Sequence, residues 1–157
     1  MELIEKILCE ENLQKAIRKV KKNKGAPGVD KMTVQEVEEW FNQYKEDLIS
    51  KILNKQYKPT PVKRVYIPKP NGKQRPLGIP TVVDRVIQQA MLQVLSEIYE
   101  PIFSDHSYGF RPNRSAHMAM EEVLGYLNDG YEWIVDLDIE KFFDTVNHDK
   151  LISILRE

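Results

Sequence analysis

Residues 132–144 (EWIVDLDIEKFFD) place two aspartates on one short apolar segment. Residues 133–137 are otherwise apolar and follow a glycine, which predicts a short buried strand entered from a helix-ending turn. Because side chains alternate along a strand, Asp136 and Asp138 share one face. A carboxylate beside a buried strand is costly unless a metal ion, a basic side chain or a helix N-terminus meets it. The segment therefore predicts a salt-bridged strand end or a metal site, and spacing alone does not choose between the two aspartates.

The residues after Asp138 favour the metal site. Phe142 and Phe143 are adjacent, and a new helix with Asn147 as its N-cap follows them. A nucleotidyl transferase needs a metal that activates a 3′ hydroxyl and holds a triphosphate. It also benefits from a flat side chain under the sugar, which can exclude a 2′ hydroxyl. A carboxylate followed by a bulky aromatic residue fits this chemistry.

The charge distribution points to a polyanionic partner. The 157 residues have a formal net charge of −1, with 41% hydrophobic and 30% charged residues, as in one soluble globular domain or two subdomains. Residues 48–83 contain no acidic residue. Their cations are Lys51, Lys55, Lys58, Lys63, Arg64, Lys69, Lys73 and Arg75. This run predicts a nucleic-acid-facing surface, and the alternative is a solvated lysine-rich face.

The remaining composition excludes several protein classes. The single cysteine, Cys9, excludes an internal disulfide framework and suits a reducing compartment. The first residues predict no signal peptide, and no apolar run approaches transmembrane length. We expect a cytoplasmic protein.

Hydrophobic periodicity predicts a mostly helical chain with one β-hairpin. The expected helices cover residues 3–20, 33–52, 81–98 and 115–127, with another after residue 147. Thr33 and Glu36 form a capping box for the second helix. Thr81 is expected to cap the third helix, with Asp84 in its first turn, and Ser115 to open the fourth. The third helix is expected to be the central buried one.

The hairpin is predicted from its turn. Asn71-Gly72 lies between two apolar runs, residues 62–67 and 74–79, and prolines confine both runs to edge-like strands. Such a hairpin is stiff and cationic. Lys69 and Arg75 stand on its two arms, and we expect them to bind the triphosphate of a nucleotide.

Four blocks of the sequence resemble one protein family. Asp138-Ile139-x-x-Phe142-Phe143-Asp144 resembles the first catalytic block of reverse transcriptases, in the form seen in bacterial group II intron reverse transcriptase/maturases. Residues 69–80 (KPNGKQRPLGIP) resemble its fingers motif, and residues 108–115 (YGFRPNRS) its second motif. Residues 25–30 (GAPGVD) resemble the loop of its N-terminal extension. The blocks occur in the family's order and span nearly the whole chain.

The resemblance implies an α+β fold: the fingers and partial palm of a right-hand polymerase, mostly helical with a basic β-hairpin and a palm strand. The implied parts are an N-terminal extension helix and loop (residues 1–31), the fingers (residues 32–130) and a truncated start of the palm (residues 131–157). The implied activity is RNA-directed DNA synthesis by two-metal nucleotidyl transfer with Mg²⁺.

Carried over by position, the resemblance assigns individual roles. Asp138 would be the first metal-binding aspartate and the Ile139 carbonyl a further metal ligand. Phe143 would be the sugar gate, and Lys69 and Arg75 would contact the incoming nucleotide. Template contacts would come from Lys63, Arg64, Arg111 and Arg114. The implied partners are intron RNA, an RNA template, a DNA primer and dNTPs, with no membrane.

The sequence also departs from the family pattern. It contains no Asp-Asp pair, so the two-metal site is incomplete, and we expect a fragment that is inactive alone. Homo-oligomers could form through surfaces that the missing palm would cover. Two alternative functions stay open: an RNA-binding splicing cofactor (maturase), and a reverse transcriptase of a related bacterial system such as a CRISPR-associated one. An unrelated α+β domain with a solvated hairpin is the remaining alternative.

Overall fold

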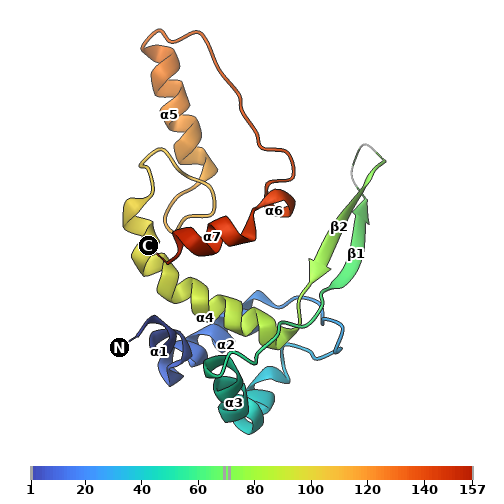
Figure 1. Ribbon diagram of the computed structural model, residues 1–157. Coiled ribbons are helices and arrows are strands. Elements are labelled where there is room, and N and C mark those ends of the chain that lie inside the picture. The colour runs from blue at the N-terminus through green and yellow to red at the C-terminus, as the bar shows by residue number, and fades with distance from the viewer. Residues whose placement is uncertain (1, 69, 71, 157) are drawn as a thin grey trace. The chain divides into compact units, whose positions relative to one another are not determined.

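The computed structural model describes residues 2–68, 70 and 72–156 (Figure 1). Its contacts divide the chain into two compact units, residues 1–104 and 105–157. The boundaries expected at residues 31 and 130 concern functional parts of a polymerase, and they stay a prediction.

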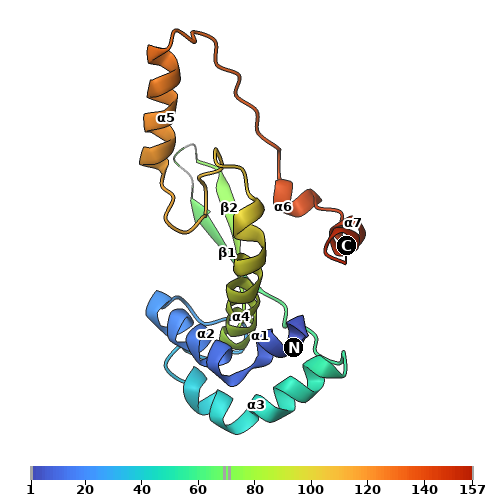
Figure 2. The same cartoon turned by 90° about the vertical axis from the view of Figure 1, so that its left-hand side faces the viewer.

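The first unit is built from four helices and a hairpin. The helices are α1 (Leu3–Leu8), α2 (Glu10–Asn23), α3 (Val37–Leu53) and α4 (Val82–Tyr99), followed by a 3₁₀ turn at Glu100–Ile102. Helices α1 and α2 both pack against α4 (Figure 2). The prediction of a central helix over residues 81–98 is confirmed, because Val82, Val86 and Ala90 are fully buried.

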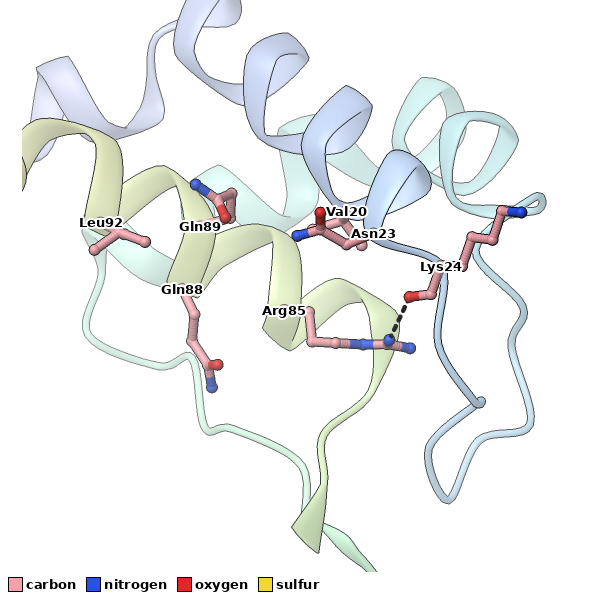
Figure 3. Close-up of a pocket in the computed structure, with 7 residues that line it drawn as sticks. All are labelled: Val20, Asn23, Lys24, Arg85, Gln88, Gln89 and Leu92. Atoms are coloured by element: carbon pink, nitrogen blue, oxygen red, sulfur yellow. Dashed lines mark hydrogen bonds between the residues drawn. The ribbon is translucent and has the colours of Figure 1, made fainter. Parts of the chain in front are cut away.

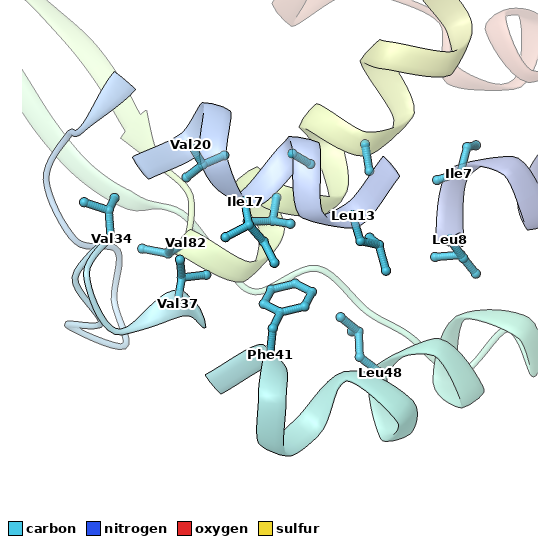
Figure 4. Close-up of a cluster of buried hydrophobic side chains, with 13 residues drawn as sticks. Ile7, Leu8, Leu13, Ile17, Val20, Val34, Val37, Phe41, Leu48 and Val82 are labelled. Carbon is cyan, nitrogen blue, oxygen red and sulfur yellow. The ribbon is translucent and has the colours of Figure 1, made fainter. Parts of the chain in front are cut away.

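The core of this unit joins the three N-terminal helices to α4 (Figure 4). Phe41 of α3 directs its ring toward Ile17 of α2, and it is among the largest fully buried side chains. The other buried apolar residues are Ile7, Leu8, Leu13, Ala16, Ile17, Val20, Val34, Val37, Leu48, Val82, Val86 and Ala90. Burial of this cluster is the main stabilising contribution to the unit.

A single helix over residues 3–20 was the wrong prediction. The backbone at Cys9 is extended, with ψ of 148°, so α1 ends there and α2 begins with Cys9 as its N-cap. The side chain of Asn12 stabilises the break, because its Nδ2 donates to Ile7 O at 2.9 Å and to Ala90 O at 3.0 Å. The helix is broken by a tertiary contact with α4.

The predicted N-caps are confirmed at three helices. The side chains of Thr81, Ser115 and Asn147 each accept a hydrogen bond from the backbone N–H three residues later, at 3.2, 3.3 and 2.9 Å. At the predicted start of the helix over residues 33–52, the Glu36 carboxylate accepts hydrogen bonds from Thr33 N at 2.7 Å and Thr33 Oγ1 at 2.6 Å. Helix α3 itself begins one residue after this turn.

The predicted hairpin is present. Strands β1 (Lys63–Pro68) and β2 (Gln74–Ile79) pair antiparallel, with Lys63 opposite Ile79 and Ile67 opposite Arg75. Gly72 has φ of +75°, a conformation that favours glycine in such turns. Asn71, the other predicted turn residue, lies outside the described residues.

The second unit contains α5 (Ala116–Asn128), α6 (Phe142–Thr145) and α7 (His148–Ile154). The palm strand predicted over residues 133–137 is wrong for this structure, since no strand is assigned between residues 131 and 139. Trp133 is 94% exposed, so the segment is also not buried. A strand exists only through hydrogen bonds to a neighbour. Within the described part of the chain, the only strands that pair are β1 and β2.

Candidate nucleic-acid and metal site

The two aspartates at positions 136 and 138 are exposed. Asp136, Asp138 and the adjacent Ile139 all face solvent in the second unit. Carboxylate and carbonyl oxygens are the hard donors that Mg²⁺ prefers, so Asp138 and the Ile139 carbonyl fit this metal chemically. The described residues contain no group of three His, Cys, Asp or Glu side chains that could hold a metal ion. Asp138 can therefore supply one part of a metal site.

The turn after Asp138 brings two aromatic rings together. Lys141 adopts a left-handed conformation (φ 52°, ψ 41°), and its carbonyl accepts hydrogen bonds from Asp144 N at 2.9 Å and Thr145 Oγ1 at 3.1 Å. Helix α6 thereby starts with Phe142 and Phe143, whose ring centroids are 5.7 Å apart. Phe143 is 90% exposed, so a ligand can reach its ring. The ring belongs to a residue that follows shortly after Asp138 in the sequence.

The hairpin register separates its cations onto two faces. Directly opposed residues point to the same side, and the side alternates along each strand. Arg75 and Lys63 therefore share one face with the apolar residues Val65 and Leu77, and Arg64 lies on the other. Lys63 and Arg75 are four pair positions apart, about 13 Å at the usual rise of a strand. Lys69, the other predicted nucleotide ligand, lies outside the described residues.

A buried carboxylate anchors the segment that leads into the hairpin. Asp84 is only 3% exposed and accepts hydrogen bonds from the Tyr57 hydroxyl, from Thr60 N at 3.2 Å and from Thr81 Oγ1 at 2.6 Å. Burial, followed by the hydrogen bond to Asp84, raises the pKa of the Tyr57 hydroxyl well above its usual value. The sequence pattern placed Asp84 only in the first turn of a helix. A carboxylate among the apolar positions of that helix was the available signal for this network.

A second missed residue, Arg85, holds the loop that resembles the N-terminal extension (Figure 3). Its Nη1 donates to Lys24 O at 3.4 Å and its Nη2 to Ala26 O at 3.0 Å. Gly25 has φ of +111°, and a Cβ there would lie 2.8 Å from Arg85 Nη1. A Cβ at Gly28 would lie 2.8 Å from Thr81 Cα, so both glycines allow close approach to α4. Arg85 also lines a pocket of about 260 Å³.

The two arginines predicted to contact the template stabilise their own loop. Arg111 Nη1 donates to Ser107 O at 2.9 Å, and Arg114 Nη1 donates to Asp105 O at 3.0 Å. The Arg114 guanidinium also lies 5.6 Å from the centroid of the Tyr108 ring. The structure thus places both arginines in the loop before α5, and their contact with a template stays a prediction.

Comparison with known proteins decides the family. Residues 67–157 match the family described as reverse transcriptase (RNA-dependent DNA polymerase). This chain belongs to the reverse transcriptase family. The match includes Arg75, Asp138, Ile139 and Phe143, whereas Lys63 and Arg64 precede it. The recognition of the family from its motifs is therefore confirmed.

Relatives of this chain include intron-encoded proteins. The chain is 41% identical over 160 residues to protein YkfC of Escherichia coli, covering 98% of this chain and 42% of the relative. It is 41% identical over 135 residues to the group II intron-encoded protein LtrA of Lactococcus lactis, covering 85% of this chain and 22% of LtrA. Nuclear intron maturase 1 of Arabidopsis thaliana is 31% identical over 78 residues, covering 50% of this chain and 11% of the maturase. This chain thus spans less than half the length of these relatives.

Within the described residues, no helix of this chain is both long enough and apolar enough to span a membrane.

Proposed function

We propose that this chain supplies the fingers and the first part of the palm of a group II intron-encoded reverse transcriptase. The observation that carries the proposal is the family match over residues 67–157, which includes both the second hairpin strand and the Asp138 block. The relative LtrA is named as a group II intron-encoded protein, which supports the intron class. The proposed reaction is the copying of an RNA template into DNA from a DNA primer and dNTPs.

In the proposed site, Asp138 and the Ile139 carbonyl would hold Mg²⁺. A bound metal would lower the pKa of the attacking hydroxyl and neutralise charge on the triphosphate. The guanidinium of Arg75 donates two parallel hydrogen bonds to phosphate oxygens, and Lys69 adds a point charge. The exposed ring of Phe143 packs under the sugar and excludes a 2′ hydroxyl.

The hairpin faces imply a division of the nucleic-acid contacts. We assign Lys63 to the face that carries Arg75 and therefore to the template near the incoming nucleotide. Arg64, on the opposite face, contacts a different part of the RNA. Arg111 and Arg114 contact the template from the loop before α5, which their hydrogen bonds stabilise. Intron RNA is the further proposed partner of this basic surface. We also propose that copies of the chain associate into homo-oligomers.

A second candidate function is an RNA-binding splicing cofactor. It is favoured by the acid-free basic run of residues 48–83 and by relatives that are named maturases. The two functions depend on different residues, because DNA synthesis needs the Asp138 carboxylate and RNA binding needs the hairpin cations. A CRISPR-associated reverse transcriptase is the third candidate, and it shares the polymerase chemistry of the first.

The test compares primer extension on an RNA template by three proteins. They are the product of the complete reading frame, its Asp138→Asn variant and residues 1–157 alone. We expect extension only by the first, since residues 1–157 contain no Asp-Asp pair and cannot hold two metal ions about 3.5 to 4 Å apart. Extension by residues 1–157 that disappears on Asp138→Ala would contradict the expected inactivity. A complete protein that binds RNA tightly but never extends would favour the splicing cofactor.

A further inference from the structure

A pocket between α3 and the segment that leads into the hairpin has no part in the polymerase chemistry proposed above. Its volume is about 430 Å³, within the usual range for small-molecule sites. Its lining comes from the loop at residues 30–32, from one side of α3, from residues 56–60 and from the start of α4. All of these belong to the first unit.

An aromatic residue, Trp40, lines this pocket. Trp40 is half-buried and packs against the core, with its ring centroid 5.3 Å from that of Phe41 and 5.3 Å from that of Tyr44. These neighbours fix the orientation of the indole. Leu48 and Val83 add apolar atoms to the lining. An aromatic ring together with apolar neighbours suits a planar, partly apolar ligand.

Two further lining residues, Tyr57 and Thr60, are held by Asp84. Tyr57 and Thr60 both donate to Asp84, the former through its hydroxyl and the latter through its backbone N–H at 3.2 Å. Lys58 lies between these two anchored residues. Since Trp40, Tyr57 and Thr60 are held by residues that do not line the pocket, a ligand finds the site already formed and loses less binding energy to ordering.

The charges at the rim are of both signs. Lys58 is exposed and has no ion-pair partner within the described part of the chain. Lys51 is already paired with Asp47 at 2.6 Å, and the Asp30 carboxylate accepts a hydrogen bond from Met32 N at 3.3 Å. The carboxylates keep free lone pairs, because each oxygen can accept more than one hydrogen bond. The rim thus offers an ammonium for an anion and carboxylates for an amino group.

We propose that this pocket binds one unpaired nucleotide of RNA whose base carries an exocyclic amino group. The base stacks on Trp40, its amino group donates to Asp30 or Asp47, and its phosphate lies on Lys58. Aromatic side chains hold single-stranded nucleic acid by such stacking, and carboxylates accept from the amino group of cytosine. The choice of RNA as ligand rests on the function proposed above. Lys58 belongs to the same acid-free run as Lys63, so a strand bound at the hairpin can continue to the pocket.

The fluorescence of Trp40 can report the binding of a ligand in this pocket. It has two tryptophans, and replacing the exposed Trp133 by phenylalanine leaves Trp40 as the only one. We would titrate this variant with CMP, AMP, UMP and ribose 5-phosphate and record indole fluorescence. We expect saturable quenching by CMP and AMP, about tenfold weaker binding of UMP, and no quenching by ribose 5-phosphate. Equal quenching by ribose 5-phosphate, or no saturable change with any nucleotide, would overturn the proposal.

A matched pair of lysine variants tests the phosphate contact. Lys58→Ala should weaken CMP binding about tenfold and reduce its salt dependence, because one phosphate contact is lost. Lys19→Ala removes an exposed lysine of α2 that does not line the pocket, and it should leave CMP binding unchanged. Equal losses in both variants would overturn the Lys58 assignment. Thermal unfolding of each variant confirms that it is folded.

Binding of single-stranded RNA to residues 1–157 separates the failure of this proposal from that of the proposed function. If Lys63→Ala weakens RNA binding while CMP does not quench Trp40, the pocket proposal is wrong and the reverse transcriptase proposal stands. If no RNA binds and CMP does not quench, both the pocket and the RNA-binding role of the hairpin are wrong. Quenching by CMP without hairpin-dependent RNA binding would support the pocket alone.

Discussion

Removing one hydroxyl tests whether the Asp84 network holds the hairpin segment. In Tyr57→Phe the ring stays, but the hydrogen bond to the buried Asp84 carboxylate is lost. Hydrogen bonds to charged groups contribute about 1.5–3 kcal/mol, and the carboxylate keeps two other donors, Thr60 N and Thr81 Oγ1. We expect the free energy of unfolding to fall by about 2 kcal/mol.

The same variant should change the dependence of stability on pH. The pKa of Tyr57 is raised in the folded protein, chiefly by burial and then by Asp84, above the ordinary value of about 10 expected in the unfolded chain. A raised pKa means that the stabilisation is complete below about pH 10 and is lost as the pH rises toward the folded value. Wild type should therefore lose stability between about pH 10 and 11, and Tyr57→Phe should lose less.

The assay is urea unfolding followed by Trp40 fluorescence in the Trp133→Phe background, at pH 7 and at intervals up to pH 11. Tyr44→Phe is the matched control, because this tyrosine lies 42% exposed on the surface of α3. The control should change stability by less than about 0.5 kcal/mol. The reasoning is refuted if Tyr57→Phe is as stable as the control at pH 7, or if both lose stability equally at high pH.

Three further predictions concern the loop and the hairpin. Gly28→Ala should destabilise the fold by about 1–3 kcal/mol in urea unfolding, because its Cβ would lie 2.8 Å from Thr81 Cα, a backbone atom. Arg85→Lys should release the loop beside α4, because an ammonium cannot span the two carbonyls that the guanidinium bridges; cleavage by trypsin at Lys24 should then be faster. Lys63→Ala should lower the slope of log K against log salt for single-stranded RNA by about 0.7.

Each of these predictions has a control within the chain. Gly109→Ala should be tolerated, because no heavy atom lies within 4 Å of its Cβ position. Arg18→Lys changes an exposed residue of α2 and should leave the rate of cleavage at Lys24 unchanged. Lys19→Ala is the control for RNA binding. Results for the test variants that match those of their controls would contradict the assigned contacts.

Local sequence signals determined the elements that need only near neighbours. Three N-caps formed as predicted, because each requires a side-chain oxygen and an N–H three residues later. The hairpin formed because its turn and strands lie within residues 62–79. Adjacent residues of a strand point to opposite faces, so the order of Lys63 and Arg64 in the chain is enough to separate them. The family was likewise recognisable from four ordered blocks.

Tertiary contacts decided the rest. The break at Cys9 depends on Asn12 binding Ala90, which is 78 residues away, and periodicity within the helix carries no information about that contact. The buried state of Asp84 and the clamp made by Arg85 likewise join α4 to segments at residues 24–26 and 57–60. Residues 133–137 have the composition of a strand, but a strand needs a hydrogen-bonded neighbour. The composition of a segment sets its propensity to form a strand, but the strand forms only where another strand pairs with it.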